Sequence, residues 1–213
     1  MSMLKKLRLS LLITLFIIIT PSYAKTIVVL GDSLSAAYGI QPSEGWVALL
    51  KQKLRVEDLN FKVLNLSTSG DTSINSLTKI RNYYKKNDIK ILIIQIGSND
   101  ALRGLSLSQL KKNILAIISI AKKNNSLILL LANRFPPNYG NKFTMMYQEL
   151  FNKIAKDENI PIVDQLLKGV AENSNLMQAD GLHPKVKAQS IMLDNIWLLL
   201  KPLILSSKPC KIK

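Results

Sequence analysis

The chain contains a single histidine, His183, within the short segment Asp180–Pro184. Ser33, a serine that could be its partner, stands far toward the other end of the chain, directly after the first strand-like run. A serine hydroxyl is a poor nucleophile until a base removes its proton, and histidine usually does so because its ordinary pKa is about 6.5. If the chain is a serine hydrolase that uses histidine, the base is His183, and Asp180 is the natural residue to orient its imidazole.

Acyl transfer also needs hydrogen-bond donors for the negative charge that develops on the carbonyl oxygen. Three candidates follow three different strand-like runs: the Ser33 N–H, the Gly70 N–H and the Asn99 side-chain amide. A glycine at position 70 lets the backbone approach a substrate with no Cβ in the way. We therefore predict an oxyanion hole formed by these three residues, beside a catalytic triad of Ser33, Asp180 and His183.

Each of these motifs has an ordinary structural explanation when it is taken alone. Gly31–Ser35 and Gly70–Thr72 are compatible with plain turns, and Gly97–Asp100 with a strand-ending loop that caps a helix. A lone histidine near a helix start is more often a surface or core residue than a catalytic one. The argument for chemistry is that all four signals occur together, each where the carboxyl end of a strand or a site-forming loop is expected.

The elements that must position these residues alternate between strands and helices. Apolar runs typical of buried strands lie at residues 26–30, 61–66, 91–96, 127–131 and 160–163. Helical spacing is found at residues 46–54, 74–86, 106–123, about 142–158 and about 184–200 or beyond. Pro184 suits the first turn of the last helix. This alternation indicates a mainly parallel sheet covered on both faces, with the polar motifs meeting at its carboxyl edge.

The first 24 residues have the pattern of a cleavable secretory signal peptide. Three basic residues precede an apolar run at residues 11–19, and small residues lead to Ala24. The run is shorter than the ~20 apolar residues that span a bilayer, although an uncleaved anchor is the alternative. We predict cleavage after Ala24, a periplasmic or secreted protein, and a single domain at residues 25–213.

The chain is strongly basic. Its formal net charge of +15 falls to +12 when Lys5, Lys6 and Arg8 leave with the signal peptide. Such an excess could serve nucleic acid, an anionic membrane surface or acidic ligands. The lysines are scattered over helix-like surface positions and do not alternate with aromatic residues, so nucleic-acid binding is not expected. Solvated helix faces account for most of the charge, and weak contact with anionic lipid headgroups is the better functional interpretation.

Together the motifs resemble the SGNH (GDSL) hydrolase superfamily, which is named after its serine, glycine, asparagine and histidine. The four segments that match the family's motifs in order are Gly31–Ser35, Ser69–Ser73, Gly97–Asp100 and Asp180–Pro184. Further strings resemble the branch of periplasmic multifunctional thioesterases, lysophospholipases and arylesterases: Leu30–Ala36, Leu102–Gly104, Pro137–Gly140 and Met177–Gly181. Ser98 is a departure, because the family often has glycine or alanine at that position.

The resemblance implies a three-layer, flavodoxin-like α/β sandwich with a mainly parallel five-stranded sheet, and chemistry without metal or cofactor. It also implies hydrolysis of acyl esters and thioesters, including lysophospholipids and aryl or alkyl esters, through an acyl-enzyme on Ser33. The candidates for lining an acyl groove are Leu102, Phe135, Pro137 and Tyr139. We expect a monomer. Two alternatives remain open: a carbohydrate O-deacetylase on the same scaffold, and a non-catalytic basic binding protein of the cell envelope.

Overall fold

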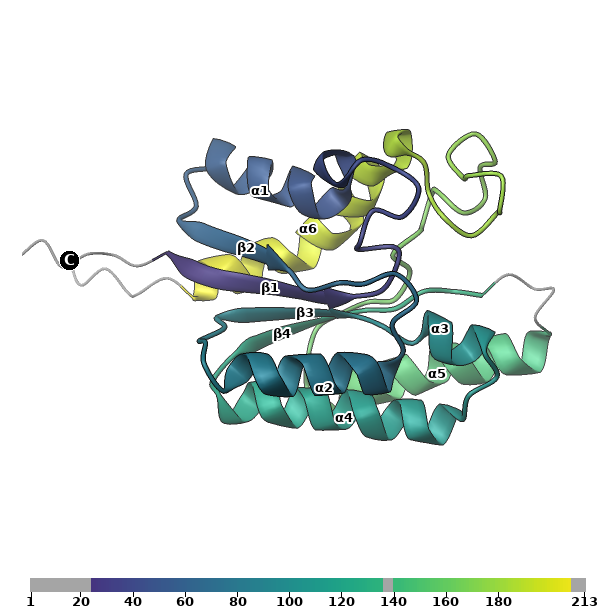
Figure 1. Ribbon diagram of the computed structural model, residues 1–213, viewed down its shortest axis with the longest axis horizontal. Coiled ribbons are helices and arrows are strands. Elements are labelled where there is room, and N and C mark those ends of the chain that lie inside the picture. Colours follow the sequence, from purple (N-terminus) through teal and green to yellow (C-terminus); the bar gives the residue numbers. More distant parts are fainter. Residues whose placement is uncertain (1–23, 136–139, 208–213) are drawn as a thin grey trace, which may run out of the picture.

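A single five-stranded sheet forms the centre of the molecule (Figure 1). The computed structural model describes residues 24–135 and 140–207. The strand order is β2-β1-β3-β4-β5 and every pairing is parallel. The strands are Lys25–Gly31 (β1), Phe61–Asn65 (β2), Ile91–Gln95 (β3), Leu127–Leu131 (β4) and Ile162–Val163 (β5).

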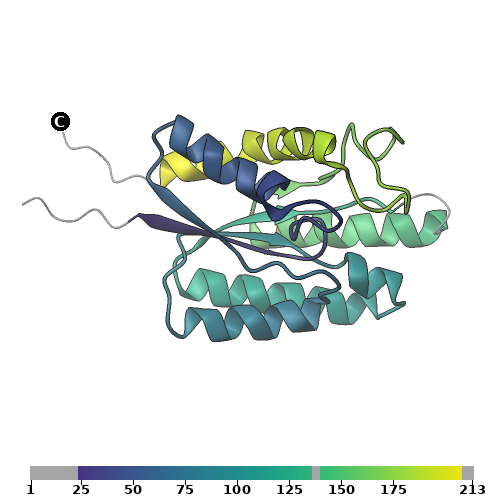
Figure 2. The same ribbon diagram turned by 45° about the horizontal axis from the view of Figure 1, so that its top comes forward.

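Helices cover both faces of this sheet, which makes three layers (Figures 1 and 2). One face carries α1 (Trp46–Val56) and α6 (Gln189–Ser206). The other face carries α2 (Ser73–Tyr84), α4 (Leu107–Lys123) and α5 (Asn141–Glu158). The predicted three-layer α/β fold with a parallel five-stranded sheet is therefore confirmed.

The strands supply both hydrophobic cores, because successive side chains of a strand point to opposite faces. In β1, Ile27 and Val29 pack with the core under α1 and α6, whereas Val28 and Leu30 pack with the core under α2, α4 and α5. All four side chains are fully buried. Burial on both faces explains why the strands read as continuous apolar runs rather than as alternating ones.

The last helix is the main disagreement with the sequence-based prediction. Pro184 was expected in its first turn, but α6 begins only at Gln189, after a short 3₁₀ turn, η3 (Val186–Ala188). Pro184 instead forms an isolated antiparallel bridge with Met177. The prediction was wrong because the chain before the helix folds back on itself to place the residues around His183, and proline closes that fold-back.

A second difference is a short helix, α3 (Ser98–Leu102), where only a strand-ending loop was expected. Gly97 precedes it with a φ of +113°, a left-handed conformation that glycine adopts without strain. Five residues are too few to show helical periodicity, so the sequence gives little sign of α3. Its first turn carries Asn99, which is thus held on a helix rather than on a free loop.

The strand order places the polar motifs together. The chain leaves β1 for β2 on one side and returns to β3 on the other side of β1. A crevice forms at such a switch point, outside the carboxyl ends of the strands. Ser33 follows β1, Gly70 follows β2 and Asn99 follows β3, so three distant parts of the sequence meet at this edge.

Candidate active site

Ser33, His183 and Asp180 form a hydrogen-bonded row, although Ser33 and His183 are 150 residues apart in sequence. The Ser33 Oγ lies 2.9 Å from the His183 Nε2, and the His183 Nδ1 lies 2.7 Å from the Asp180 Oδ2. An ionised carboxylate only accepts hydrogen bonds, so it selects the tautomer with the proton on Nδ1. That leaves Nε2 free to accept the Ser33 hydroxyl, which is the arrangement a general base requires.

A tight turn holds Asp180 and His183 face to face. The Asp180 Oδ1 accepts the backbone N–H groups of Leu182 and His183, at 2.9 and 3.0 Å. Gly181 takes a left-handed φ of +66° at the centre of this turn. Aspartate favours such turns because its short side chain can satisfy backbone groups two and three residues ahead. Both oxygens of Asp180 are thus fixed within one turn.

The environment keeps Asp180 ionised. Partial desolvation by itself would raise the pKa of its carboxyl, but the hydrogen bond from the His183 imidazole outweighs that effect, together with two backbone N–H donors. The net result lowers the pKa of Asp180 to about 2. A permanent negative charge beside Nδ1 can stabilise the imidazolium that forms when His183 takes a proton.

The nucleophile sits on the turn after β1, and that turn is fixed by buried polar contacts. Asp32 is fully buried, and its Oδ1 accepts the Leu34 N–H at 3.1 Å and the Gln95 amide at 2.9 Å. The Gln95 Oε1 in turn accepts the Ser35 hydroxyl at 2.7 Å. Burial raises the pKa of Asp32 to about 6, against the lowering effect of the Gln95 hydrogen bond. The Ser33 turn is therefore anchored on both sides of the nucleophile.

Two of the three predicted oxyanion-hole residues line one cavity, and the third stands next to a residue that one of them contacts. Ser33 and Asn99 line the same cavity, whereas Gly70 is not among its lining residues. Gly70 is joined to Asn99 through its neighbour, because the Asn99 Nδ2 donates to the Asp71 carbonyl at 3.0 Å. Within residues 24–135 and 140–207, the Ser33 and Gly70 N–H groups donate to no protein acceptor. Among the described residues, neither donor is therefore used within the protein.

The cavity beside Ser33 has mostly apolar walls. Leu102 and Phe135, two predicted substrate contacts, both line it. A neighbouring hollow shares Phe135 and reaches Met145 on α5. The other two predicted contacts, Pro137 and Tyr139, lie outside the described residues.

Two residues that the sequence did not single out support the histidine. The Tyr38 ring lies 4.4 Å from the His183 ring, between centroids. The Gln178 Nε2 donates to the Tyr38 carbonyl at 2.8 Å and to the Pro184 carbonyl at 3.1 Å. Gln178 therefore ties the loop of the nucleophile to the loop of the base. Spacing carries no signal for Tyr38, whereas Gln178 falls within the family-like string Met177–Gly181.

Gln95 was also missed, although the sequence held a sign of it. A polar residue stands within the otherwise apolar strand β3 and is only 2% exposed. Buried polar side chains are normally hydrogen-bonded, so such a residue indicates a polar partner close by. Here the partners are Asp32 and Ser35, which flank the nucleophile.

Comparisons with known proteins identify the family of the chain. A family model described as "GDSL-like Lipase/Acylhydrolase" matches residues 27–196. The chain belongs to this family. GDSL-family membership makes the chain an enzyme, a serine ester hydrolase, and sets aside the alternative of a non-catalytic binding protein.

Three relatives place the chain within the GDSL family. It is 36% identical to "Esterase TesA" of Pseudomonas aeruginosa over 200 residues, which cover 94% of this chain and 100% of that protein. It is 33% identical to the "Thioesterase 1/protease 1/lysophospholipase L1" of Escherichia coli over 181 residues, which cover 85% and 86%. Among solved structures, the psychrotrophic esterase EstA from Pseudoalteromonas sp., inhibited by monoethylphosphonate, matches with a TM-score of 0.80 and 34% identity, covering 85% of this chain and 99% of that one.

Proposed function

We propose that the chain hydrolyses acyl esters and thioesters through a covalent acyl-enzyme on Ser33. The observation that carries the proposal is the row formed by Ser33, His183 and Asp180, with a 2.9 Å contact between nucleophile and base. The mostly apolar cavity beside Ser33 supports an acyl group as the part of the substrate that is bound there.

In the first half of the reaction, the Ser33 Oγ attacks the carbonyl carbon of the substrate while His183 Nε2 takes the hydroxyl proton. Asp180 holds the imidazole and stabilises its positive charge. The tetrahedral intermediate then collapses, and its bond to the leaving alcohol or thiol breaks as His183 returns the proton to that group. The product of this half-reaction is an ester between the acyl group and Ser33.

In the second half, water attacks the acyl-enzyme and gives up a proton to His183. The carboxylic acid leaves and Ser33 regains its proton. Both halves place negative charge on the same carbonyl oxygen. We assign its stabilisation to the Ser33 and Gly70 N–H groups and to the Asn99 amide, each of which is worth roughly 3 kcal/mol in comparable enzymes.

We infer a substrate range from the apolar walls and from the names of the relatives. Leu102 and Phe135 flank the cavity and are assigned to the acyl chain, and we keep Pro137 and Tyr139 as further candidates. The named activities of the relatives are esterase, thioesterase and lysophospholipase. We propose aryl and alkyl esters, acyl thioesters and lysophospholipids as the substrates of this chain.

We further propose an exported monomer with residues 1–24 as a signal peptide and residues 25–213 as its hydrolase domain. β1 starts at Lys25, directly after the proposed cleavage site. The monomer is proposed because one chain completes the row of Ser33, His183 and Asp180 and needs no residue of a partner for it.

Weak contact with an anionic membrane surface is the last part of this proposal. Leu102, Leu105 and Leu182 are 41%, 45% and 37% exposed near the site, beside the exposed cations Arg103 and Lys185. Such mixed apolar and cationic edges suit lipid headgroups. Binding to phosphatidylglycerol vesicles, weakening as salt rises, checks this part.

The test of the reaction uses p-nitrophenyl esters from acetyl to palmitoyl, with the purified mature chain and its Ser33→Ala variant. We expect turnover by the wild type and loss of at least about 10³-fold in the variant. Acetylated sugars in the same panel distinguish an O-deacetylase, which would prefer them to longer acyl esters. Equal rates for wild type and variant would contradict a role for Ser33.

A further inference from the structure

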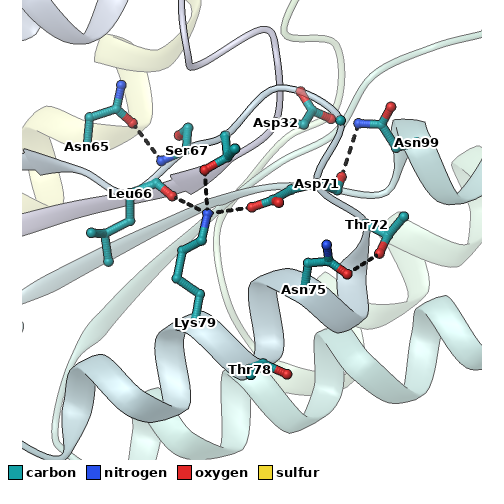
Figure 3. A network of polar contacts seen from close by, with 12 residues as sticks. Asp32, Asn65, Leu66, Ser67, Asp71, Thr72, Asn75, Thr78, Lys79 and Asn99 are labelled. Carbon is teal, nitrogen blue, oxygen red and sulfur yellow. Dashed lines mark hydrogen bonds and ion pairs between the residues drawn. The ribbon is translucent and has the colours of Figure 1, made fainter.

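The loop that carries Gly70 is held by Lys79, which belongs neither to the triad nor to the oxyanion hole (Figure 3). The Lys79 Nζ, on α2, donates to the Leu66 carbonyl at 2.8 Å and to the Thr68 Oγ1 at 2.7 Å. It also forms an ion pair with the Asp71 Oδ2. An ammonium group has three donors, and these three contacts use all of them. One side chain thus holds the loop at three points between β2 and α2.

The setting of this ion pair differs from that of an ordinary surface pair. The side chains of Lys79 and Asp71 are 29% and 10% exposed. Exposed ion pairs contribute little because water competes with them, whereas a half-buried pair that also satisfies backbone groups fixes a geometry. In this lysine-rich chain most other lysines are exposed, Lys86 beyond the end of α2 among them.

Asp71 connects this ion pair to the oxyanion hole. Its side chain is held by Lys79, while its backbone carbonyl accepts the Asn99 Nδ2 at 3.0 Å (Figure 3). Gly70, the residue before it, has a left-handed φ of +83°. A displacement of Asp71 would therefore move the Gly70 N–H and reorient the Asn99 amide at the same time.

Side chains rather than sheet hydrogen bonds hold the tip of this loop. The sheet ends at Asn65, and the Thr68 N–H still bonds to the Gly31 carbonyl. Beyond that point the Arg103 Nη2 donates to the Gly70 carbonyl at 2.9 Å. On the far side the Asp100 carboxylate accepts the Ser73 N–H at 2.7 Å. From α2, Lys79 contacts the loop at Leu66, Thr68 and Asp71, and Asn75 contacts it at Thr72.

We propose that Lys79 is a positioning residue for the reaction: through Asp71 it holds the Gly70 N–H and the Asn99 amide where the oxyanion forms. This inference rests on the proposed function of the site. Lys79 touches neither substrate nor reacting atoms and acts only through the loop. Its contribution therefore belongs to the transition state, where the oxyanion exists, and not to binding of the ground-state substrate.

The test compares Lys79→Met with Lys86→Met on a p-nitrophenyl ester. Each substitution removes one positive charge, but only the first removes the loop contacts. We expect kcat to fall about ten- to a hundred-fold in Lys79→Met, with KM changed less than about threefold. Lys86→Met should keep the wild-type kcat, and Lys79→Arg, which retains the charge, should recover most of the loss.

A double-mutant cycle with Asp71→Asn tests the route of the effect. If Lys79 acts through Asp71, the double variant should lose about as much kcat as either single variant, rather than the product of the two losses. Asp71→Asn keeps the backbone carbonyl and the side-chain shape, so it carries the test if Lys79→Met does not fold. Thermal unfolding of each variant confirms that the folded protein is assayed.

Two results would overturn the inference while leaving the proposed function intact. One is an unchanged kcat in folded Lys79→Met beside an inactive Ser33→Ala. The other is a loss that appears only in KM. By contrast, absence of ester turnover by the wild type, or full activity of Ser33→Ala, would contradict the proposed function itself.

Discussion

Two aspartates flank the reacting groups, and their surroundings are opposite. Asp180 lies on a solvent-facing turn with its side chain 38% exposed, and both of its oxygens accept hydrogen bonds. Asp32 is fully buried next to Ser33, and its Oδ2 has no hydrogen-bond partner among the described residues. The pKa is lowered to about 2 in Asp180 and raised to about 6 in Asp32.

The two pKa values differ because Asp32 is buried, whereas Asp180 is partly exposed and accepts hydrogen bonds from the imidazole and from two backbone N–H groups. Asp180 has enough donors to stay charged and is in contact with the imidazole, so it can orient His183. Asp32 bears an unsatisfied oxygen in the protein interior and is disfavoured as an anion. We interpret Asp32 as a support of the turn after β1 that costs stability at neutral pH.

The largest expected effect is on kcat, when Asp180 and Asp32 are each replaced by asparagine. Asp180→Asn should lower kcat by roughly 10²- to 10⁴-fold, because the amide no longer selects the Nδ1–H tautomer or stabilises the imidazolium. Asp32→Asn keeps an oxygen for Leu34 and Gln95 and should lower kcat less than about tenfold. Steady-state kinetics on one ester checks both, and equal losses at the two positions would break the comparison.

The acid side of the pH–rate profile is the second prediction. Because the pKa of Asp180 is about 2, this carboxylate stays charged above about pH 4. Loss of the Asp180 charge should therefore leave kcat/KM unchanged above about pH 4, whereas a proton on His183 Nε2 would stop it from accepting the Ser33 proton. We expect a loss of about tenfold per pH unit below the midpoint. A profile in which kcat/KM does not fall on the acid side would contradict His183 as the base.

The third prediction concerns how the free energy of unfolding depends on pH through the buried carboxyl of Asp32. The pKa of Asp32 is about 6 in the folded chain, against an ordinary value of 3.8, so the folded state binds more protons between these values. Stability should thus fall as pH rises from about 4 to about 6. Asp32→Asn should then raise the free energy of unfolding at pH 7.5 by about 1–3 kcal/mol, with little gain at pH 3.5. Urea unfolding at both pH values measures this, and a destabilised variant at pH 7.5 would be the opposite result.

The smallest effect is the contribution of Asp180 to stability. Its pKa is lowered on folding, so its contribution is present above about pH 4 and is lost as pH falls toward 2. The side chain is more than a third exposed, so solvent screening limits the contribution to less than about 1 kcal/mol. Urea unfolding of Asp180→Asn at pH 7 should differ little from wild type. A decrease of several kcal/mol in the free energy of unfolding would show that the main role of Asp180 is to stabilise the turn.

Much of the fold could be predicted because its strands are short apolar runs that end in polar motifs. β4 has the predicted bounds, and β1, β2, β3 and β5 differ from the predictions by at most two residues at either end. The start of α6 and the existence of α3 could not be predicted, because both depend on loops that fold to serve the site. Apolar periodicity does not predict such segments, because their conformation is set by hydrogen bonds between residues that are distant in the sequence.

The sequence likewise predicts some residues of the candidate site and not others. Ser33, Asp180 and His183 lie in short motifs that can be recognised in the sequence. In a parallel sheet the carboxyl ends of the strands lie at one edge, which predicts that these motifs meet there. The supporting contacts of Gln95, Gln178 and Lys79 could not be predicted from spacing, because each joins segments that are far apart in the chain. From the sequence alone, Lys79 is interpreted as a solvated charge on a helix. Its contacts with the Gly70 loop become evident only in the structure.

The most direct test of the central claim is mass spectrometry after reaction with a p-nitrophenyl alkylphosphonate. The Ser33 Oγ should form a bond to phosphorus and release p-nitrophenolate, which leaves one stable adduct per chain. We predict that peptide mapping finds this adduct on Ser33, that ester hydrolysis is lost in parallel, and that His183→Ala reacts far more slowly. An adduct on another residue, or full hydrolysis by a chain labelled on Ser33, would contradict the account.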